Sequence, residues 1–233
     1  MIDLSADLGE GSPGEDQLWP LISSANVACG GHVGDDASMA AAARYASQYG
    51  VRFGAHPSYP DREHFGRRTL DIDPAALRDS LIAQIAALQA HAPDRRVAHV
   101  KPHGALYNDA HGNRGLAEVI VAAIRAIDPT MALVAPDHSQ MAAAGRAAGI
   151  PVIREAFADR RYEPDGSLTP RSLAGSTLTI EEAATQAALL AHEGVVVARD
   201  GTRVTIPFDT LCVHADMSGA LERLNAIRAA IAD

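Results

Sequence analysis

The only lysine of the chain, Lys101, lies between two histidines in the segment VAHVKPHGALYN. The chain has 20 Lys and Arg residues, and all of the others are arginines. A lysine ammonium is a compact point charge whose pKa shifts readily on burial, so one retained lysine suggests a chemical role rather than an exposed position kept by chance. Alternation along an extended segment places His99, Lys101 and His103 on one face. We expect Lys101 and His103 in a catalytic site, and His99 in the interior.

Two carboxylates follow the first apolar run of the chain. In the segment DLSADLGEG, Asp7 and Glu10 stand where a strand is predicted to end. Carboxylates in such a position act as a general base or hold a divalent ion. The alternative is that Asp7 caps the turn at Gly9 and that Glu10 is a solvated loop residue. We favour a catalytic role for both, together with His56, which also follows a predicted strand and can shuttle a proton.

Short apolar runs alternate with alanine-rich helical stretches, a pattern typical of β/α folds. Strands are predicted near residues 2–6, 24–28, 52–55, 97–100, 131–134, 152–155 and 210–213. Capping residues mark the predicted helices: one from Asp35 or Asp36 to Tyr49, one from Asp73 and Pro74 to about His91, one after a Thr179 and Glu182 capping box to His192, and a closing one near 217–232.

Polar side chains stand at the end of nearly every predicted strand. They are Asp7, His32, His56, Lys101 with His103, Asp137, Glu155, and His214 with Asp216. In a barrel, the carboxyl ends of the strands form a ring around one site, whereas an open sheet spreads them along a crevice. The pattern therefore predicts an irregular (β/α) barrel of about seven parallel strands, formed by residues 1–233 as a single domain.

Composition excludes several classes of function. A chain of 233 residues with 47% hydrophobic content can bury one sizeable core. The net charge of −9 and the pI near 5.5 argue against a nucleic-acid or anionic-membrane partner. No segment has the pattern of a membrane span or signal peptide, so we expect a cytoplasmic protein whose two cysteines, Cys29 and Cys212, are buried thiols. No P-loop or dinucleotide fingerprint occurs.

Six motifs, taken together, resemble those of the lactam-utilisation (LamB/YcsF) family from Ile2 to about Asp216. They are DLSADLGEG, ANVACGGHVGDD, FGAHPSYPDREHFGRR, HVKPHGALYN, REAFADRRYEPDGSLTPRS and LCVHAD. The resemblance implies an irregular barrel related to glycoside hydrolases and deacetylases. It also implies ATP-dependent opening of 5-oxoproline to glutamate, carried out with two partner subunits, B and C.

The chain departs from the family pattern at three positions. Ser5 stands where that pattern has asparagine, Gly31 where it often has an aromatic residue, and Ala215 where it has glycine. Loss of an amide at position 5 can alter how Asp7 is oriented, and Ala215 lacks a glycine's backbone freedom. The resemblance therefore leaves open a somewhat different lactam substrate.

The implied reaction suggests roles for individual residues. Lys101 suits a phosphate or oxyanion, His103 or His56 a proton transfer, and Asp7 with Glu10 either base catalysis or the Mg²⁺ of Mg-ATP. Arg67 and Arg68 can clamp phosphate or contact a partner subunit. The loop near residues 159–171 can act as a lid. For binding substrate or ATP we predict the following residues: His32, Asp35, Arg67, Arg68, Tyr107, Glu155, Arg171 and His214.

Two other classes of function remain open at this stage. One is a stand-alone metal-dependent amidase or deacetylase that holds Zn²⁺ with Asp7, His56 and His103. The other is a non-catalytic scaffold that positions a catalytic partner. The metal, if any, is not identified by the sequence, and Asp35 is also a good helix cap.

Overall fold

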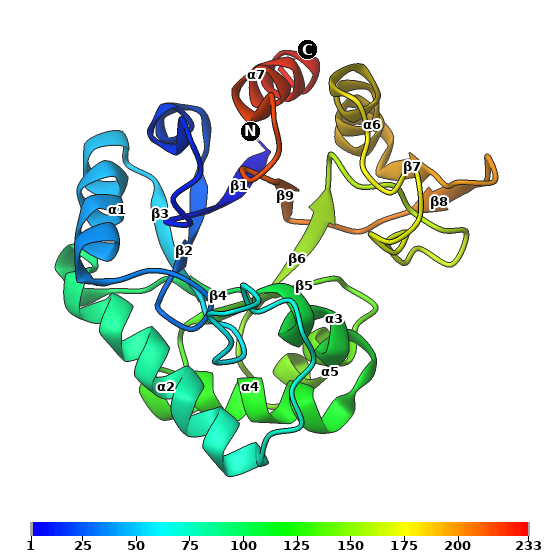
Figure 1. Ribbon diagram of the computed structural model, residues 1–233. Coiled ribbons are helices and arrows are strands. Elements are labelled where there is room, and N and C mark those ends of the chain that lie inside the picture. The colour runs from blue at the N-terminus through cyan, green and yellow to red at the C-terminus, as the bar shows by residue number, and fades with distance from the viewer. Residues whose placement is uncertain (1, 233) are drawn as a thin grey trace.

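A closed barrel of parallel strands forms the centre of the protein, and helices lie outside it (Figure 1). The computed structural model describes residues 2–232. In order around the barrel, the strands are β1 (Asp3–Leu8), β2 (Ser24–Ala28), β3 (Arg52–His56), β4 (His99–Val100), β5 (Ala132–Ala135), β6 (Val152–Phe157) and β9 (Thr210–Val213). All seven overlap the predicted strands, and β9 closes the ring by pairing with both β6 and β1. The predicted irregular (β/α) barrel is confirmed.

Seven α-helices are described, and the predicted caps are present. They are α1 (Asp36–Tyr49), α2 (Pro74–His91), α3 (Gly104–Gly112), α4 (Arg114–Ile127), α5 (Gln140–Ala147), α6 (Ile180–Glu193) and α7 (Ala220–Ala230). Asp35 accepts a hydrogen bond from the backbone N–H of Ser38, and Thr179 forms a capping box with Glu182. None of the helices within residues 2–232 is both long and apolar enough to cross a membrane.

A two-stranded antiparallel hairpin was not predicted from the sequence. It consists of β7 (Val195–Val197) and β8 (Arg203–Thr205), and it lies outside the barrel near α6 (Figure 1). Strands of three residues are too short for alternation to identify them. The hairpin matters because Thr205 helps to line a cavity described below.

The barrel interior is partly polar, and one glycine leaves space for a buried histidine side chain. Asp7 on β1 is in register with Asn26 on β2, and Asn26 is in register with Gly54 on β3. A Cβ atom at Gly54 would lie 2.1 Å from His99 Nε2, so only glycine leaves space for that imidazole. His99 reaches across β3 to Asn26 Oδ1, 2.9 Å away. His99 is therefore an interior residue, as predicted.

Candidate active site

A cavity of about 590 Å³ opens at the carboxyl ends of the barrel strands. Asp7 lines it from β1, His56 from β3 and Phe157 from β6, while Lys101 and His214 follow β4 and β9 directly. The residues predicted from separate strand ends therefore meet in one place. This is where barrel enzymes carry their active sites.

Lys101 lies between two carboxylates. Its Nζ atom is 2.9 Å from Asp7 Oδ1 and 2.8 Å from Glu155 Oε1, and it also donates to Cys212 Sγ at 3.1 Å. Tyr107 donates its hydroxyl to the other oxygen of Glu155 at 2.6 Å. An ammonium has three protons. Lys101 thus donates hydrogen bonds to Asp7 and Cys212 and forms an ion pair with Glu155, so its charge is balanced within the protein.

The charges of this group stabilise one another against burial. Burial alone would raise the pKa of Asp7, but His56 and Lys101 hold it well below its usual range. Burial would likewise lower the pKa of Lys101, but Asp7 and Glu155 hold it well above its usual value. Asn26 donates to Asp7 Oδ1 at 2.9 Å and fixes its orientation. Asp7 is therefore an ionised carboxylate at neutral pH.

A second group combines Glu10 with three histidines. Glu10 Oε1 is 3.0 Å from His32 Nε2, 3.5 Å from His103 Nδ1 and 4.0 Å from His56 Nε2. The ring of His32 stacks on that of His103 at 3.7 Å between centroids. Glu10 is therefore a buried carboxylate in contact with imidazoles, and not a solvated loop residue.

Backbone carbonyls set the tautomers of two of these rings. His56 donates its Nδ1–H to the carbonyl oxygen of Lys101 at 2.7 Å, and His103 donates its Nε2–H to that of Phe65 at 2.9 Å. Each ring therefore turns its remaining nitrogen toward the other, with His103 Nδ1 3.0 Å from His56 Nε2.

Burial and neighbouring charges shift the pKa values of this group in different directions. Burial lowers the pKa of His32 to about 3 and that of His103 to about 2, so both are neutral. Burial would lower the pKa of His56 too, but the Asp7 carboxylate raises it above its ordinary value. Burial raises the pKa of Glu10 to about 7, with a contribution from the Asp7 charge.

A carboxylate orients His214 at the opposite side of the cavity. His214 Nδ1 is 2.9 Å from Asp159 Oδ1, and the backbone N–H of His214 donates to Asp159 Oδ2 at 2.7 Å. Burial would raise the pKa of Asp159, but His214 lowers it, so the carboxylate is ionised. The ring of His214 also stacks on Phe157 at 5.7 Å between centroids. His214 therefore has one fixed orientation, with Nε2 left to take or give a proton.

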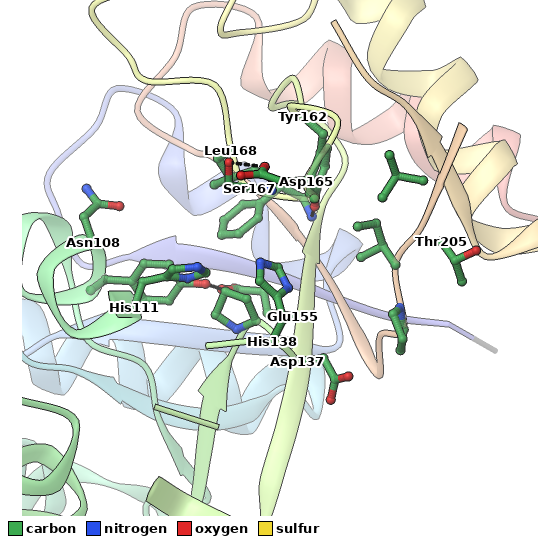
Figure 2. Close-up of a pocket in the computed structure, with 17 residues that line it drawn as sticks. Asn108, His111, Asp137, His138, Glu155, Tyr162, Asp165, Ser167, Leu168 and Thr205 are labelled. Carbon is green, nitrogen blue, oxygen red and sulfur yellow. Dashed lines mark hydrogen bonds between the residues drawn. The ribbon is translucent and has the colours of Figure 1, made fainter. Parts of the chain in front are cut away.

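A second cavity of about 360 Å³ adjoins the first, and Figure 2 shows the residues that line it. The two cavities share Tyr107, Asn108, Phe157 and Leu168. His111 and His138 lie edge to face at 5.0 Å between centroids, and Figure 2 shows them together near Glu155. Thr205 lines the cavity from the hairpin. His111, in the last turn of α3, is therefore a cavity residue.

Comparison with known proteins identifies the family. The LamB/YcsF family model matches residues 2–233. The chain belongs to the LamB/YcsF family. It is 49% identical over 223 residues to the 5-oxoprolinase A subunit of Methylococcus capsulatus, covering 92% of this chain and 86% of the relative. It is also 46% identical to the 5-oxoprolinase A subunit of Neisseria meningitidis serogroup A, and the match covers 97% of this chain and 94% of the relative.

A solved structure agrees with this LamB/YcsF assignment. The lactam utilization protein of Thermus thermophilus superposes with a TM-score of 0.91 and 40% identity, covering 99% of this chain and 96% of that one. The family resemblance seen in the six motifs is thus confirmed, and so is the α/β barrel.

The departures from the LamB/YcsF pattern have a structural setting. The amide that contacts Asp7 comes from Asn26, while Ser5 is buried and its hydroxyl has no hydrogen-bond partner among the described residues. A Cβ atom at Gly31 would lie 2.3 Å from Gln84 Oε1. The space beside Gly31 is thus occupied by Gln84. Ala215 is buried and lines the cavity.

Two predicted site residues lie elsewhere. Asp35 is exposed and caps α1, and it lines neither cavity. Arg68 is exposed and donates to His64 Nε2 at 2.7 Å, so its guanidinium is directed at a neighbour in its own loop. Asp35 was predicted from the family resemblance, with helix capping as the alternative, and Arg68 as one of two adjacent arginines able to clamp phosphate. The sequence alone does not fix the direction of these exposed side chains.

The remaining predicted residues line one of the two cavities, apart from His32, which contacts Glu10. Arg67 lines the cavity and pairs with Asp216 at 2.6 Å, and Arg171 lines it without an ion pair among residues 2–232. Lys101 and Arg67 are each already paired with a carboxylate, so Arg171 is the cavity cation best placed to meet an anion. Asp159 was assigned only to a loop in the sequence. Asp159 stands two positions after β6, and His214 stands one position after β9. Because β6 and β9 are neighbours in the barrel, the positions just after these strands were the signal that could have identified Asp159 as the partner of His214.

Proposed function

We propose that this chain is the A subunit of an ATP-dependent 5-oxoprolinase, which opens the lactam of 5-oxoproline to glutamate with hydrolysis of ATP. The names of relatives that match over most of the chain support this assignment. The observation that carries it is the cavity at the strand ends, where an oriented imidazole, a buried ion pair and guanidinium groups face one space.

Opening a lactam requires three things of the protein. Charge that develops on the carbonyl oxygen must be stabilised, water must lose a proton, and the ring nitrogen must gain one. His214 suits the proton transfers because Asp159 holds its Nδ1 side and leaves Nε2 free. The Asp7 and Lys101 pair supplies a fixed dipole beside it.

The substrates are anions, and the cavity has cations to receive them. We propose that Arg171 binds the carboxylate of 5-oxoproline or a phosphate of ATP, because it lines the cavity without a carboxylate partner among the described residues. We propose the adjoining cavity for the adenine of Mg-ATP. Its walls include Tyr107, Phe157 and Tyr162, and flat aromatic or apolar surfaces suit a purine ring. Phosphates would then extend past Leu168 toward Arg171.

The relatives carry the letter A in their subunit names, which denotes one component of a multi-subunit enzyme. We propose that this chain works with partner subunits B and C, and that ATP hydrolysis and ring opening are coupled only in the complex. The exposed guanidinium of Arg67, at the cavity mouth, is a candidate contact for a partner.

The test is release of glutamate and ADP from 5-oxoproline and Mg-ATP, by the chain alone and with its partner subunits. We expect coupled release only from the complex, and a loss of about 100-fold or more in His214→Asn. His192→Asn, which changes an exposed histidine of α6, is the matched control and should leave turnover unchanged. Thermal melting shows whether each variant is folded.

Other outcomes point to the other classes of function. Ring opening by the chain alone without ATP would favour the metal-dependent amidase. Full turnover in both His214→Asn and Lys101→Ala complexes would show that this cavity is not the reaction centre, as expected of a scaffold.

A further inference from the structure

Three donor atoms from separate segments face one another at one side of the main cavity. They are Glu10 Oε1, His56 Nε2 and His103 Nδ1. We infer that these residues bind one divalent metal ion of the class that favours nitrogen ligands, such as Zn²⁺. Binding of the ion goes beyond the proposed function and does not depend on it.

The distances fit an ion at the centre of the three atoms. The sides of the triangle are 3.0 Å between the two nitrogens, 3.5 Å from Glu10 to His103 and 4.0 Å from Glu10 to His56. In the plane of the three atoms, the point equidistant from them is about 2.1 Å from each, which is the usual length of a Zn²⁺–N or Zn²⁺–O bond. An ion can therefore enter with little movement of the side chains.

The surroundings orient the rings as metal sites do. A histidine that binds a metal ordinarily donates its other ring N–H to a backbone carbonyl or carboxylate. His56 does so to Lys101 and His103 to Phe65, which leaves His56 Nε2 and His103 Nδ1 as the nitrogens that face the centre. His32 Nε2 contacts Glu10 Oε1 at 3.0 Å, and this contact orients the Glu10 carboxylate.

The backbone around the site is shaped to make these contacts. Phe65, whose carbonyl accepts from His103, has a left-handed φ of 54°, which is unfavourable for a non-glycine residue. A Cβ atom at Gly104, the residue after His103, would lie 2.5 Å from the carbonyl oxygen of Gly66. The loop that contains Phe65 and Gly66 therefore approaches the start of α3 closely, next to the hydrogen bond between Phe65 and His103.

The donor set decides the type of ion and leaves a place for a ligand. Two imidazoles and one carboxylate suit Zn²⁺, Co²⁺ or Fe²⁺, whereas Mg²⁺ prefers oxygen atoms alone. Three protein ligands leave a fourth position, as in catalytic zinc sites, and all three residues line the cavity. That position would receive water or a carbonyl oxygen of a bound molecule.

The experiment measures binding directly rather than activity. The full chain is stripped with a chelator and titrated with Zn²⁺ by calorimetry, and with Co²⁺ by visible absorption. We expect one ion per chain and the intense visible bands of a low-symmetry Co²⁺ site, with no displacement by excess Mg²⁺. Zn²⁺ should also raise the melting temperature, because it binds the folded state.

Variants identify the ligands. Glu10→Gln, which keeps the size of the side chain, and His103→Gln should each weaken binding by more than about tenfold. His91→Gln, which alters a histidine paired with Asp36 on the outside of the protein, should bind as the wild type does. Melting curves without metal show whether each variant is folded.

Two results would overturn the inference. The first is that the folded wild type binds neither Zn²⁺ nor Co²⁺. In that case, the 3.0 Å contact between His103 Nδ1 and His56 Nε2 is a hydrogen bond and not part of a metal site. The second is binding that survives Glu10→Gln but is lost in Asp7→Asn. Asp7 Oδ2 lies 3.3 Å from His56 Nε2, so that result would assign the ion to Asp7 instead.

Discussion

The ammonium of Lys101 lies 2.9 Å from the carboxylate of Asp7, across the interior of the barrel from β4 to β1. The two residues are 94 positions apart in the chain, and both side chains are largely buried. Removing one partner of a buried ion pair leaves the other charge without compensation, which is far more costly than losing a surface pair.

Lys101→Met should therefore lower the free energy of unfolding by about 3–5 kcal/mol. Arg114→Met, which removes an exposed pair with Glu118, is the control and should cost no more than about 0.5 kcal/mol. Urea unfolding of both variants measures the difference. Equal effects would mean that the buried pair contributes no more than a surface pair.

Asp159 should make stability depend on pH in the acid range. Its pKa in the folded protein is lowered, chiefly by His214 acting against burial, so the carboxylate stabilises the fold above its unfolded pKa of about 4. Asp159→Asn should be less stable than the wild type at pH 7. The difference should shrink as pH falls below about 4 through the lowered folded value. Unfolding curves at several pH values test this, and a constant difference would contradict it.

The two cysteines should not react while the protein is folded. Cys29 and Cys212 are both buried free thiols, as the sequence predicted. Burial raises the pKa of Cys29 to about 12 and that of Cys212 well above its usual value, so neither forms much thiolate near neutral pH. Ellman's reagent near neutral pH should detect no thiol in the native protein and both after denaturation. Rapid labelling of the native chain would show that one of them is accessible.

Gly31→Ala should destabilise the fold because the new methyl group would overlap Gln84 and Ser58, with a Cβ 2.3 Å and 2.5 Å from their side-chain oxygens. We expect a cost of about 1–3 kcal/mol. Gly112→Ala is the matched control, since Gly112 is in α3 and a Cβ there meets nothing within 4 Å. That change should be neutral or slightly stabilising. Similar melting temperatures for the two variants would show that Gln84 moves aside easily.

The sequence predicted the barrel well because each strand is an apolar run that ends in a polar residue. Lys101, His56 and Asp7 could be assigned to one rim on that basis alone. Their partners could not. Cys212 and Glu155 contact Lys101 only because the strands close into a ring, and a carbonyl group such as that of Phe65 carries no mark in the sequence that it will accept from His103.

The pairing of β1 with β9 has a consequence for how the protein is made. A ribosome releases the N-terminal strand early, but β1 keeps an open edge until residues 210–213 have been synthesised. An unfinished chain therefore exposes unpaired backbone groups that favour association with other strands. It also lacks His214, so the complete cavity cannot exist before residue 214 has left the ribosome. Synthesis itself thus delays any chemistry in this cavity until the barrel can close.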